Sequence, residues 1–450
     1  MSYTEDTLNA PRRTSPAQDE FFQAVREVLA SLGPLLDSHP RYRKERVIER
    51  IVEPERQILF RVAWVDDEGT VQVNKGYRVQ FSSTLGPVKG GLRFHPSVNG
   101  GVIKFLGFEQ ILKNALTGLP LGGGKGGANF DPKGRSDQEV MRFCQAFMTE
   151  LFRHVGPTVD VPAGDIGVGA REIGYLFGQY KRLTGRFDGV ITGKRASWGG
   201  SLGRKEATGY GCVYFAEELL RARGDGLEGK RCAVSGAGNV AVHTVERLRS
   251  MGAKPVTVTD TTGTIHHERG IDLDLLVEVK EMRRAGLAEY ARERGDARFI
   301  PVEEYPEGEH PVWSVPCDVA FPCATQNELT LADARTLVSS GCECVCEGAN
   351  MPATPDAMAH LMNAKLAYGP GKAANAGGVA TSQLEMSQNA SMQQWGLEEV
   401  DRRLREIMAN IHRSVEEAAA EFGEPGNLVF GANIAGFRKV ADAMIEQGIH

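Results

Sequence analysis

The stretch CAVSGAGNVA, residues 232–241, contains the pattern that decides the fold class of this chain. Three of its positions, Gly236, Gly238 and Ala241, form a G-x-G-x-x-A motif. In a strand–turn–helix unit, the first glycine makes a tight turn and the second lets a pyrophosphate approach the backbone. The alanine keeps the helix close to the sheet, and the helix N-terminus offers amide N–H groups to the phosphates.

The motif alone is a weak signal, and the residues around it decide whether it indicates a dinucleotide site. An apolar strand precedes it, a predicted helix over residues 240–251 follows it, and a second predicted strand ends at Asp260. A tight strand–helix turn without any ligand is the alternative. The complete strand–turn–helix–strand setting favours a dinucleotide site over that alternative.

The same alternation of strands and helices continues toward the C-terminus. Beyond Arg231 the predicted strands are RCAVS, VTVTD, CDVAFPCA, CECVCEGAN and LAYGPG, with helical segments between them. This rhythm predicts a parallel sheet covered by crossover helices. Cys342, Cys344 and Cys346 alternate along one strand, so we expect them on its buried face and predict no metal site there.

The first 200 residues lack this rhythm. A predicted helix begins near Pro16 and ends at the glycine–proline pair 33–34, and alternating residues around the turn 66–69 predict a strand pair. A capping box, Ser136 with Glu139, predicts the start of another helix. Strands and helices in this mixed order predict an α+β domain.

The composition excludes several classes of protein. A chain of 450 residues with 41% hydrophobic and 24% charged residues is typical of a soluble protein with two or three domains. A net charge of −6 argues against nucleic-acid binding, and the basic run RYRKER is expected to be a solvated helix face. Residues 1–20 lack the apolar segment of a signal peptide, and no window reaches the ~18 apolar residues of a membrane span. Eight cysteines in so long a chain do not indicate a disulfide scaffold, so we expect a reduced, cytoplasmic protein.

A second glycine-rich stretch, LGGGKGGANFDPKG at residues 121–134, places Lys125 between glycines. A phosphate-binding loop needs Ser or Thr after its lysine, and Gly126 stands there, which excludes that class of site. A mobile turn with a surface lysine is the alternative to a functional lysine. Further candidate residues are Lys89 in GPVKGGLRFHP, Gln110 and Lys113 in GFEQILKNAL, Asp165 in DVPAGDIGVG, and Val379 and Ser382 in NAGGVATSQLEMSQN.

Together these motifs resemble the hexameric glutamate dehydrogenases of bacteria and lower eukaryotes, over nearly the whole chain. The resemblance implies reversible oxidative deamination of L-glutamate to 2-oxoglutarate and ammonium in a homohexamer. It implies an α/β architecture in which residues 1–200, completed by a C-terminal helix near 425–450, bind substrate and form the oligomer. Residues 201–424 would form a Rossmann-type, doubly wound dinucleotide-binding domain.

The same resemblance implies roles for the matching residues. Lys125 would be the catalytic lysine, and Asp165 the carboxylate that transfers protons. Lys89 and Ser382 would hold the side-chain carboxylate of glutamate. The chain departs from the family pattern at Gln383, where a small residue is expected after the serine, and this bears on the fine shape of the distal pocket.

The remaining implied contacts involve the α-carboxylate and the coenzyme. Lys113, with Gln110 beside it, would hold the α-carboxylate, while the Gly164 backbone and Val379 would also touch the substrate. The implied coenzyme-binding residues are Thr208, Gly236, Gly238, Asn239, Val240, Asp260, Thr261, Lys280 and Asn350.

The residue types suit this chemistry. A five-carbon dicarboxylate needs two separate cationic contacts, and lysines supply them as point charges. A free lysine has a pKa near ~10.4, so catalysis by Lys125 requires burial and neighbouring cations to lower that pKa. We expect the glycines around Lys125 to let substrate and backbone approach the amine in a cleft that closes.

The coenzyme preference depends on the end of the second strand. Asp260 by itself suggests a hydrogen bond to a free ribose 2′-hydroxyl, which favours NAD. The neighbouring threonines and the cations Lys280, Arg283 and Arg284 instead suit a 2′-phosphate, unless those cations form an ordinary solvated helix face. The resemblance to NADP-dependent members of the family favours NADP, with NAD as the alternative.

Two other functions stay open at this stage. A dehydrogenase for leucine, valine or phenylalanine shares the fold and the chemistry, but it needs an apolar pocket where this chain has Lys89 and Ser382. A non-catalytic dinucleotide-binding regulator would have no need of Lys125 and Asp165. The residues therefore favour a glutamate dehydrogenase.

Overall fold

The computed structural model describes residues 18–449 of the chain. The predicted helix start near Pro16, and nearly all of the stretch assessed as a signal peptide, lie outside the described residues. Within the described range, no helix combines the length and the apolar composition needed to cross a membrane.

The described chain forms two compact units. The first unit contains the described residues up to Arg204, together with Val379–Val400 and the described residues from Asn433 onward. The second unit contains Lys205–Gly378 and Asp401–Ala432. The predicted domain boundaries differ from these units mainly at residues 379–400, and they stay a prediction.

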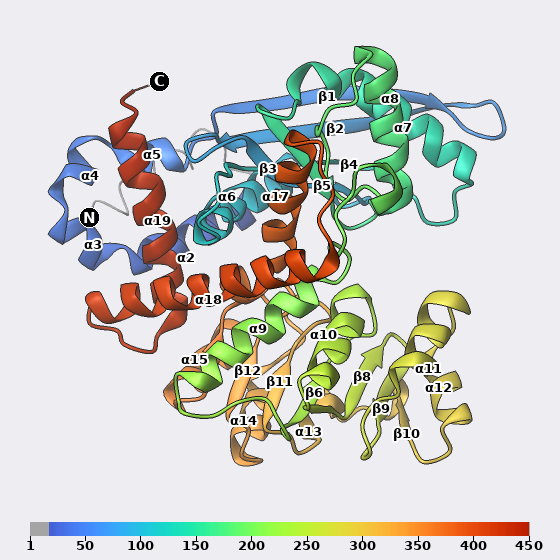
Figure 1. The fold of residues 1–450 in the computed structure, drawn as a ribbon, viewed down its shortest axis with the longest axis vertical. Helices are drawn as coiled ribbons and strands as arrows, with labels where there is room; N and C mark the ends of the chain where they lie inside the picture. The colour runs from blue at the N-terminus through green and yellow to red at the C-terminus, as the bar shows by residue number, and fades with distance from the viewer. Residues whose placement is uncertain (1–17, 450) are drawn as a thin grey trace. The chain divides into compact units, whose positions relative to one another are not determined.

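The first unit is built on a five-stranded mixed sheet (Figure 1). Strand β3 pairs in parallel with both β4 and β5, so that Leu92 has Gly126 on one side and Gly164 on the other. This register brings Lys125 and Asp165, the neighbours of those two glycines, to the same part of the sheet. The strands run in the order β1 (Arg56–Val65), β2 (Val71–Ser82), β4 (Gly123–Ala128), β3 (Val88–Phe94) and β5 (Asp160–Gly164), with β1 and β2 joined by the predicted turn.

Strand β4 shows that the alternative of a mobile turn around Lys125 is wrong. Every residue of β4 is buried within the sheet. A Cβ on Gly124 would lie 2.6 Å from the Val79 carbonyl oxygen, and one on Gly126 would lie 2.8 Å from the Tyr77 carbonyl oxygen. The glycines therefore allow neighbouring strands to pack closely, as expected for the approach of backbone, and the approach of substrate to the amine stays a prediction.

Helices lie on both faces of this sheet. Leu92 and Phe94 belong to a core with α7 (Asp137–Leu151) and α8 (Ala170–Thr184). The alternate residues of β3, including Lys89 and Arg93, therefore lie on the opposite face, where α6 (Gly100–Leu116) packs against β4. The candidate functional side chains of β3 thus share the face covered by α6.

Two predicted helix boundaries can be compared with the structure. Helix α7 begins with the predicted capping box, in which the Ser136 Oγ accepts from the Glu139 amide at 3.1 Å. Helix α2 (Asp19–Ser31) ends before the predicted stop at 33–34, and Pro34 instead lies in the first turn of α3 (Gly33–Ser38). A proline is tolerated there because the first helical turn does not use its N–H group.

The second unit contains a five-stranded parallel sheet (Figure 1). Helices α9 (Ala207–Arg221) and α10 (Asn239–Ser250) pack against each other and against its strands. The direction of winding reverses between β6 and β11, the place where doubly wound sheets bind ligands. The strand order is β13 (Ala367–Gly369), β12 (Cys344–Cys346), β11 (Val319–Phe321), β6 (Arg231–Val234) and β7 (Lys254–Pro255), which confirms the predicted α/β class.

One predicted parallel strand is paired differently. Strand β8 (Thr257–Asp260) pairs antiparallel with β9 (Gly263–His266), in a three-stranded sheet completed by β10 (Arg298–Pro301). The end of β8 nevertheless stays beside the glycine motif, because the Thr259 amide donates to the Gly236 carbonyl oxygen at 3.1 Å. Asp260 is therefore positioned next to the turn that carries the motif.

The remaining predictions concern the cysteines and the C-terminal helices. Cys342, Cys344 and Cys346 are all buried. Only Cys344 and Cys346 lie on β12, however, and Cys342 precedes the strand and packs in the same core cluster as Val345, so the prediction of one shared strand face is wrong for Cys342. Among residues 18–449, no group of three or more histidine, cysteine, aspartate or glutamate side chains is placed to hold a metal ion. The last helices are α17 (Gly377–Ala390), α18 (Leu397–Glu421) and α19 (Leu428–Glu446).

Candidate active site

The amine of Lys125 and the carboxylate of Asp165 lie together in the first unit. Lys125 Nζ is 3.2 Å from Asp165 Oδ2, and the same oxygen accepts a hydrogen bond from Arg93 Nε at 2.8 Å. Lys125 is only 7% exposed. A Cβ on Gly91 would lie 3.4 Å from Lys125 Nζ and 2.8 Å from the Asp165 Cβ, so the glycine at that position leaves room for both groups.

The electrostatics of this pair follow from burial and from the charges around it. Burial lowers the pKa of Lys125, the charge of Asp165 opposes that shift, and the charge of Arg93 reinforces it. Burial would raise the pKa of Asp165, but the charges of Lys125 and Arg93 outweigh it and hold that pKa below its ordinary value. An ionised carboxylate beside an amine with a depressed pKa is an arrangement that can hold and transfer a proton.

Lys89 forms a second cationic point. It is 1% exposed, and its Nζ donates to Thr192 Oγ1 at 2.8 Å. Burial and the charge of Arg204 lower the pKa of Lys89 well below its ordinary value, while the charge of Glu385 opposes this. Ser382 is buried on α17 about one helical turn before Glu385. A buried ammonium beside the Thr192 hydroxyl suits a carboxylate ligand.

Helix α6 contributes Gln110 and Lys113. Gln110 Nε2 donates to Asn114 Oδ1 at 2.7 Å, and Asn114 Nδ2 donates to the carbonyl oxygen of Lys89 at 3.2 Å. Burial and the charge of Lys125 lower the pKa of Lys113 to about 8. The charges of Lys113 and Lys125 thus act on each other, and Asn114 connects α6 to the backbone of Lys89.

A buried ion pair fixes the strands that carry these groups. Arg78 of β2 and Asp160 of β5 are both fully buried, and Arg78 Nε donates to Asp160 Oδ2 at 2.8 Å. Arg78 Nη1 also donates to the Gly90 carbonyl oxygen at 3.1 Å, which ties in β3 between them. Removal of one partner from such a pair costs about 3–5 kcal/mol, because it leaves an uncompensated buried charge.

The other predicted substrate contacts lie nearby in the same unit. Gly164 ends β5 and directly precedes Asp165. Val379 is half-buried on α17, about one turn before Ser382. Gln383 is also half-buried, and its Oε1 accepts a hydrogen bond from Ser387 Oγ at 3.4 Å along the same helix.

In the second unit, the glycine motif forms the turn from β6 to α10. Gly236 has a φ of +85°, a left-handed conformation that favours glycine. A Cβ on Gly238 would meet no atom of the described chain within 4 Å beyond its sequence neighbours, so the space at the helix N-terminus is open. Asn239 opens the helix, and its Nδ2 donates to the Lys205 carbonyl oxygen at 2.7 Å. The turn therefore fits a pyrophosphate.

Three further predicted coenzyme residues surround this turn. Thr208 lies in the first turn of α9, where a Cβ on its neighbour Gly209 would be 2.7 Å from the Val240 carbonyl oxygen. The loop after β12 approaches from the other side, since a Cβ on Gly348 would lie 3.2 Å from Val240 Cγ1. Asn350 belongs to that loop. Val240 thus lies between the start of α9, which carries Thr208, and the loop that carries Asn350.

Asp260 and its neighbours define the edge of this site. Asp260 Oδ2 accepts from Lys280 Nζ at 2.5 Å, and Asp260 Oδ1 accepts from Thr262 Oγ1 at 2.6 Å. Burial would raise the pKa of Asp260, but these hydrogen bonds hold it below its ordinary value. Thr261 is exposed in the following turn. Arg283 matches the solvated-face alternative, because its guanidinium contacts Glu278, Glu289 and Glu293.

The sequence matches two models of one protein family. The model described as Glutamate/Leucine/Phenylalanine/Valine dehydrogenase matches residues 199–448. The model described as Glu/Leu/Phe/Val dehydrogenase, dimerisation domain, matches residues 54–182. The chain belongs to the Glu/Leu/Phe/Val dehydrogenase family. The resemblance inferred from the motifs is thereby confirmed.

Individual family members are similar over their whole length. The NADP-specific glutamate dehydrogenase of Helicobacter pylori (strain ATCC 700392 / 26695) is 61% identical, over 99% of this chain and 100% of the relative. The NADP-specific glutamate dehydrogenase of Escherichia coli (strain K12) is 54% identical, over 99% of this chain and 98% of the relative. The crystal structure of Plasmodium falciparum glutamate dehydrogenase has 50% identity and a TM-score of 0.95, covering 99% of this chain and 95% of that one.

Two residues that contact the predicted site were missed in the sequence. Arg93 lies in the motif GPVKGGLRFHP and, at an even spacing from Lys89, on the same strand face, which was a usable signal. Thr192 contacts Lys89 across 103 residues, and nothing in its local sequence indicates this partner. The family site is therefore larger than the motifs suggested.

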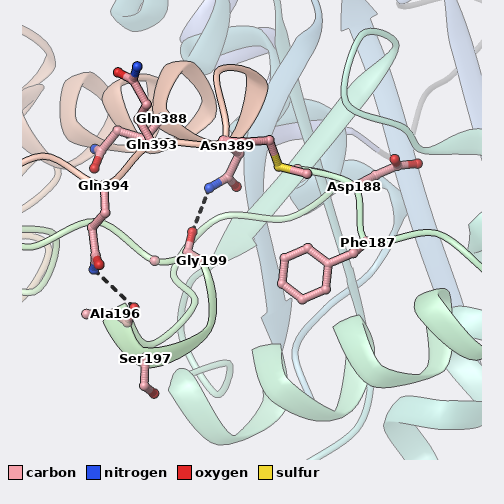
Figure 2. Close-up of a pocket in the computed structure, with 12 residues that line it drawn as sticks. Phe187, Asp188, Ala196, Ser197, Gly199, Gln388, Asn389, Gln393 and Gln394 are labelled. Carbon is pink, nitrogen blue, oxygen red and sulfur yellow. Dashed lines mark hydrogen bonds between the residues drawn. The ribbon is translucent and has the colours of Figure 1, made fainter.

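A pocket in the first unit lies apart from these residues (Figure 2). Its lining includes none of the residues predicted for the family site and comes from residues 187–200 and from the end of α17 with the segment after it. Asn389 Nδ2 donates to the Gly199 carbonyl oxygen at 2.7 Å, and Gln394 Nε2 donates to the Ala196 carbonyl oxygen at 3.1 Å (Figure 2). These bonds join the two walls of the pocket.

Proposed function

We propose that this chain is an NADP-dependent glutamate dehydrogenase, which catalyses the reversible oxidative deamination of L-glutamate to 2-oxoglutarate and ammonium. The observation that carries the proposal is the set of three lysines, the buried Lys89 and Lys125 and the half-buried Lys113, combined with the carboxylate of Asp165. Full-length identities of 54–61% to NADP-specific glutamate dehydrogenases support the same function.

The two carboxylates of glutamate bind to different cations in this proposal. Lys89 and Ser382 hold the side-chain carboxylate, and Lys113 holds the α-carboxylate. A leucine or phenylalanine side chain would leave the buried ammonium of Lys89 without its ligand, and an unsatisfied buried charge is costly. The site therefore selects a dicarboxylate. Gln110, the Gly164 backbone and Val379 complete the contacts to the substrate.

Lys125 and Asp165 move the protons. Asp165 accepts a proton from the substrate ammonium, which prepares the α-carbon to lose a hydride and leave an iminium. Lys125 in its neutral form takes a proton from a water molecule as that water bonds to the imine carbon. Asp165 then returns its proton to the nitrogen of the resulting carbinolamine. The carbon–nitrogen bond breaks and ammonia leaves, while the hydroxyl loses its proton to solvent as the carbonyl forms, and Lys125 releases its own proton to solvent. The reverse sequence aminates 2-oxoglutarate.

The second unit binds the coenzyme. NADP, when bound, supplies the acceptor for the hydride that leaves the α-carbon. The turn residues Gly236, Gly238, Asn239 and Val240 hold the pyrophosphate, with Thr208 and Asn350 beside them. Asp260 orients Lys280 through their 2.5 Å contact, and Lys280 with Thr261 holds the 2′-phosphate.

We further propose a cytoplasmic homohexamer assembled through the first unit. The match of residues 54–182 to a dimerisation-domain model supports self-association of this part. Leu59, Val71 and Val73 on β1 and β2 are 66%, 66% and 62% exposed, which suits a contact between copies. Light scattering on the purified protein tests the number of chains, and a stable monomer would contradict the proposal.

The deciding experiment is a steady-state assay of NADPH oxidation with 2-oxoglutarate and ammonium. The unchanged chain should turn over, and Lys125→Met should lose at least about 100-fold in kcat while still binding NADPH. A comparison of kcat/KM for NADPH and NADH tests the coenzyme preference. An assay of leucine oxidation tests the substrate selectivity. Retained turnover in Lys125→Met would remove the assigned role of that lysine.

A further inference from the structure

We propose that Arg93 is a positioning residue that fixes the Asp165 carboxylate and offsets its attraction for the Lys125 proton. The inference rests on the roles proposed above for Lys125 and Asp165. Arg93 Nε donates to Asp165 Oδ2 at 2.8 Å, and Lys125 Nζ lies 3.2 Å from that same oxygen. A single carboxylate oxygen therefore faces two cations, which come from adjacent strands.

The strand register explains why Arg93 reaches this oxygen. Arg93 pairs with Gly127 of β4, two residues beyond Lys125. On its other side, β3 pairs with β5, whose last residue directly precedes Asp165. Arg93 thus stands between the strand that bears the amine and the strand that leads to the carboxylate. The Arg93 and Asp165 side chains are 18% and 20% exposed, so solvent screens their contact only in part.

The charges around Lys125 show what Arg93 does. Burial favours the neutral amine, and Asp165 opposes this by favouring the ammonium. Arg93 opposes Asp165 from β3, and Arg78 of β2 and Lys113 of α6 add smaller effects of the same sign as Arg93. Arg93 also holds the carboxylate through a directed N–H donor, which those other cations do not offer to Asp165 in the hydrogen bonds described. Position and charge therefore act together.

The test is the pH profile of kcat for glutamate oxidation in the full-length enzyme. Arg93→Gln strengthens the hold of Asp165 on the Lys125 proton, so the acidic limb of the profile should move up by about one pH unit. The kcat at neutral pH should fall about 100-fold, with a smaller change in the KM for glutamate, because the carboxylate loses its fixed position. Arg182→Gln, which removes an exposed arginine at the end of α8, is the matched control and should change neither quantity.

A second variant separates charge from geometry. Arg93→Lys keeps the positive charge, so its acidic limb should stay near that of the unchanged enzyme. Its kcat should still fall, because lysine lacks the fixed guanidinium N–H donor. If Arg93→Gln does not fold, this variant decides: a reduced kcat with an unmoved limb supports the proposal, and an unreduced kcat overturns it.

The outcomes also distinguish this inference from the proposed function. An Arg93→Gln enzyme that loses activity without any movement of the acidic limb would reduce Arg93 to a purely structural role and overturn the inference. Lys125→Met reports separately on the catalytic lysine. An inactive Lys125→Met together with an unshifted Arg93→Gln profile would refute only the role of Arg93.

Discussion

Lys89 Nζ donates to Thr192 Oγ1 at 2.8 Å, and both side chains are buried. The residues after Thr192 are attached to α17, because the Gly193 amide donates to Glu385 Oε2 at 2.9 Å. Lys194 Nζ lies 2.8 Å from Glu385 Oε1 in a pair that is almost fully buried. The loop and the helix are therefore held together next to the cation proposed to bind the side-chain carboxylate.

Thr192→Val tests this relationship. The substitution keeps the shape of the side chain but removes the hydroxyl, so the buried Lys89 ammonium loses an acceptor. We expect the KM for glutamate to rise about 10-fold with a smaller change in kcat, because the contact serves binding in both the ground and the transition state. Thr192→Ser, which retains the hydroxyl, should stay close to the unchanged enzyme. Equal kinetics for Thr192→Val and Thr192→Ser would show that the hydroxyl is not used.

Two glycine-to-alanine substitutions should have opposite effects on stability. In Gly124→Ala, the added Cβ would lie 2.6 Å from the Val79 carbonyl oxygen, so the free energy of unfolding should fall by about 1–3 kcal/mol. Gly178 lies exposed within α8, and a Cβ there meets no described atom within 4 Å outside its own helix. Gly178→Ala should therefore raise the free energy of unfolding by about 0.5–1 kcal/mol. Urea unfolding at a fixed protein concentration measures both, and a neutral Gly124→Ala would contradict the packing role of β4.

The elements that the sequence predicted correctly are those with local signals. The G-x-G-x-x-A motif indicated its turn because glycine readily adopts a positive φ, and Gly236 has a φ of +85°. The capping box at Ser136 and the strand pair across residues 66–69 likewise depend on neighbours in sequence. Such features need no knowledge of the tertiary structure.

The elements that sequence reasoning missed depend on contacts between distant segments. Arg93 and Asp165 are 72 residues apart, and their pairing exists only because β3 and β5 are adjacent in the sheet. The atoms that the glycines beside Lys125 accommodate could not be predicted for the same reason, since those atoms belong to β2, β3 and α6. Pairing of Asp260 with Lys280 also could not be read from either residue separately.

Lys280→Gln tests the proposed contact with the coenzyme 2′-phosphate. The substitution removes the cation that lies 2.5 Å from Asp260 and leaves that carboxylate facing the phosphate. A lost charge-assisted hydrogen bond is worth about 1.5–3 kcal/mol, so kcat/KM for NADPH should fall roughly 10- to 100-fold. The value for NADH should change much less. Arg283→Gln is the control, because its guanidinium is already bound by glutamates and its loss should affect neither coenzyme. Equal losses for NADPH and NADH in Lys280→Gln would point to a general effect on the fold.

Lys113→Met should stabilise the folded protein while it impairs the enzyme. Burial and the charge of Lys125 lower the pKa of Lys113 to about 8, whereas an unfolded lysine titrates near ~10.4. Between these two pH values, Lys113 is protonated in the unfolded chain but largely neutral in the folded chain. Its contribution to the free energy of unfolding therefore rises with pH over this interval. Below pH 8 the folded chain carries the full cost of a buried ammonium, and the methionine variant avoids it.

The difference between the two proteins should therefore depend on pH. At pH 7 the free energy of unfolding of Lys113→Met should exceed that of the unchanged chain by on the order of 1–3 kcal/mol, and the gap should close as the pH approaches ~10.4. Urea unfolding at pH 7, 8.5 and 10 measures this trend. The other titrating groups are the same in both proteins, so their contributions to the free energy of unfolding cancel in the difference. The KM for 2-oxoglutarate should rise at the same time, because the α-carboxylate loses its cation. A methionine variant that is less stable than the unchanged chain at pH 7 would show that Lys113 contributes a stabilising contact larger than its cost of burial.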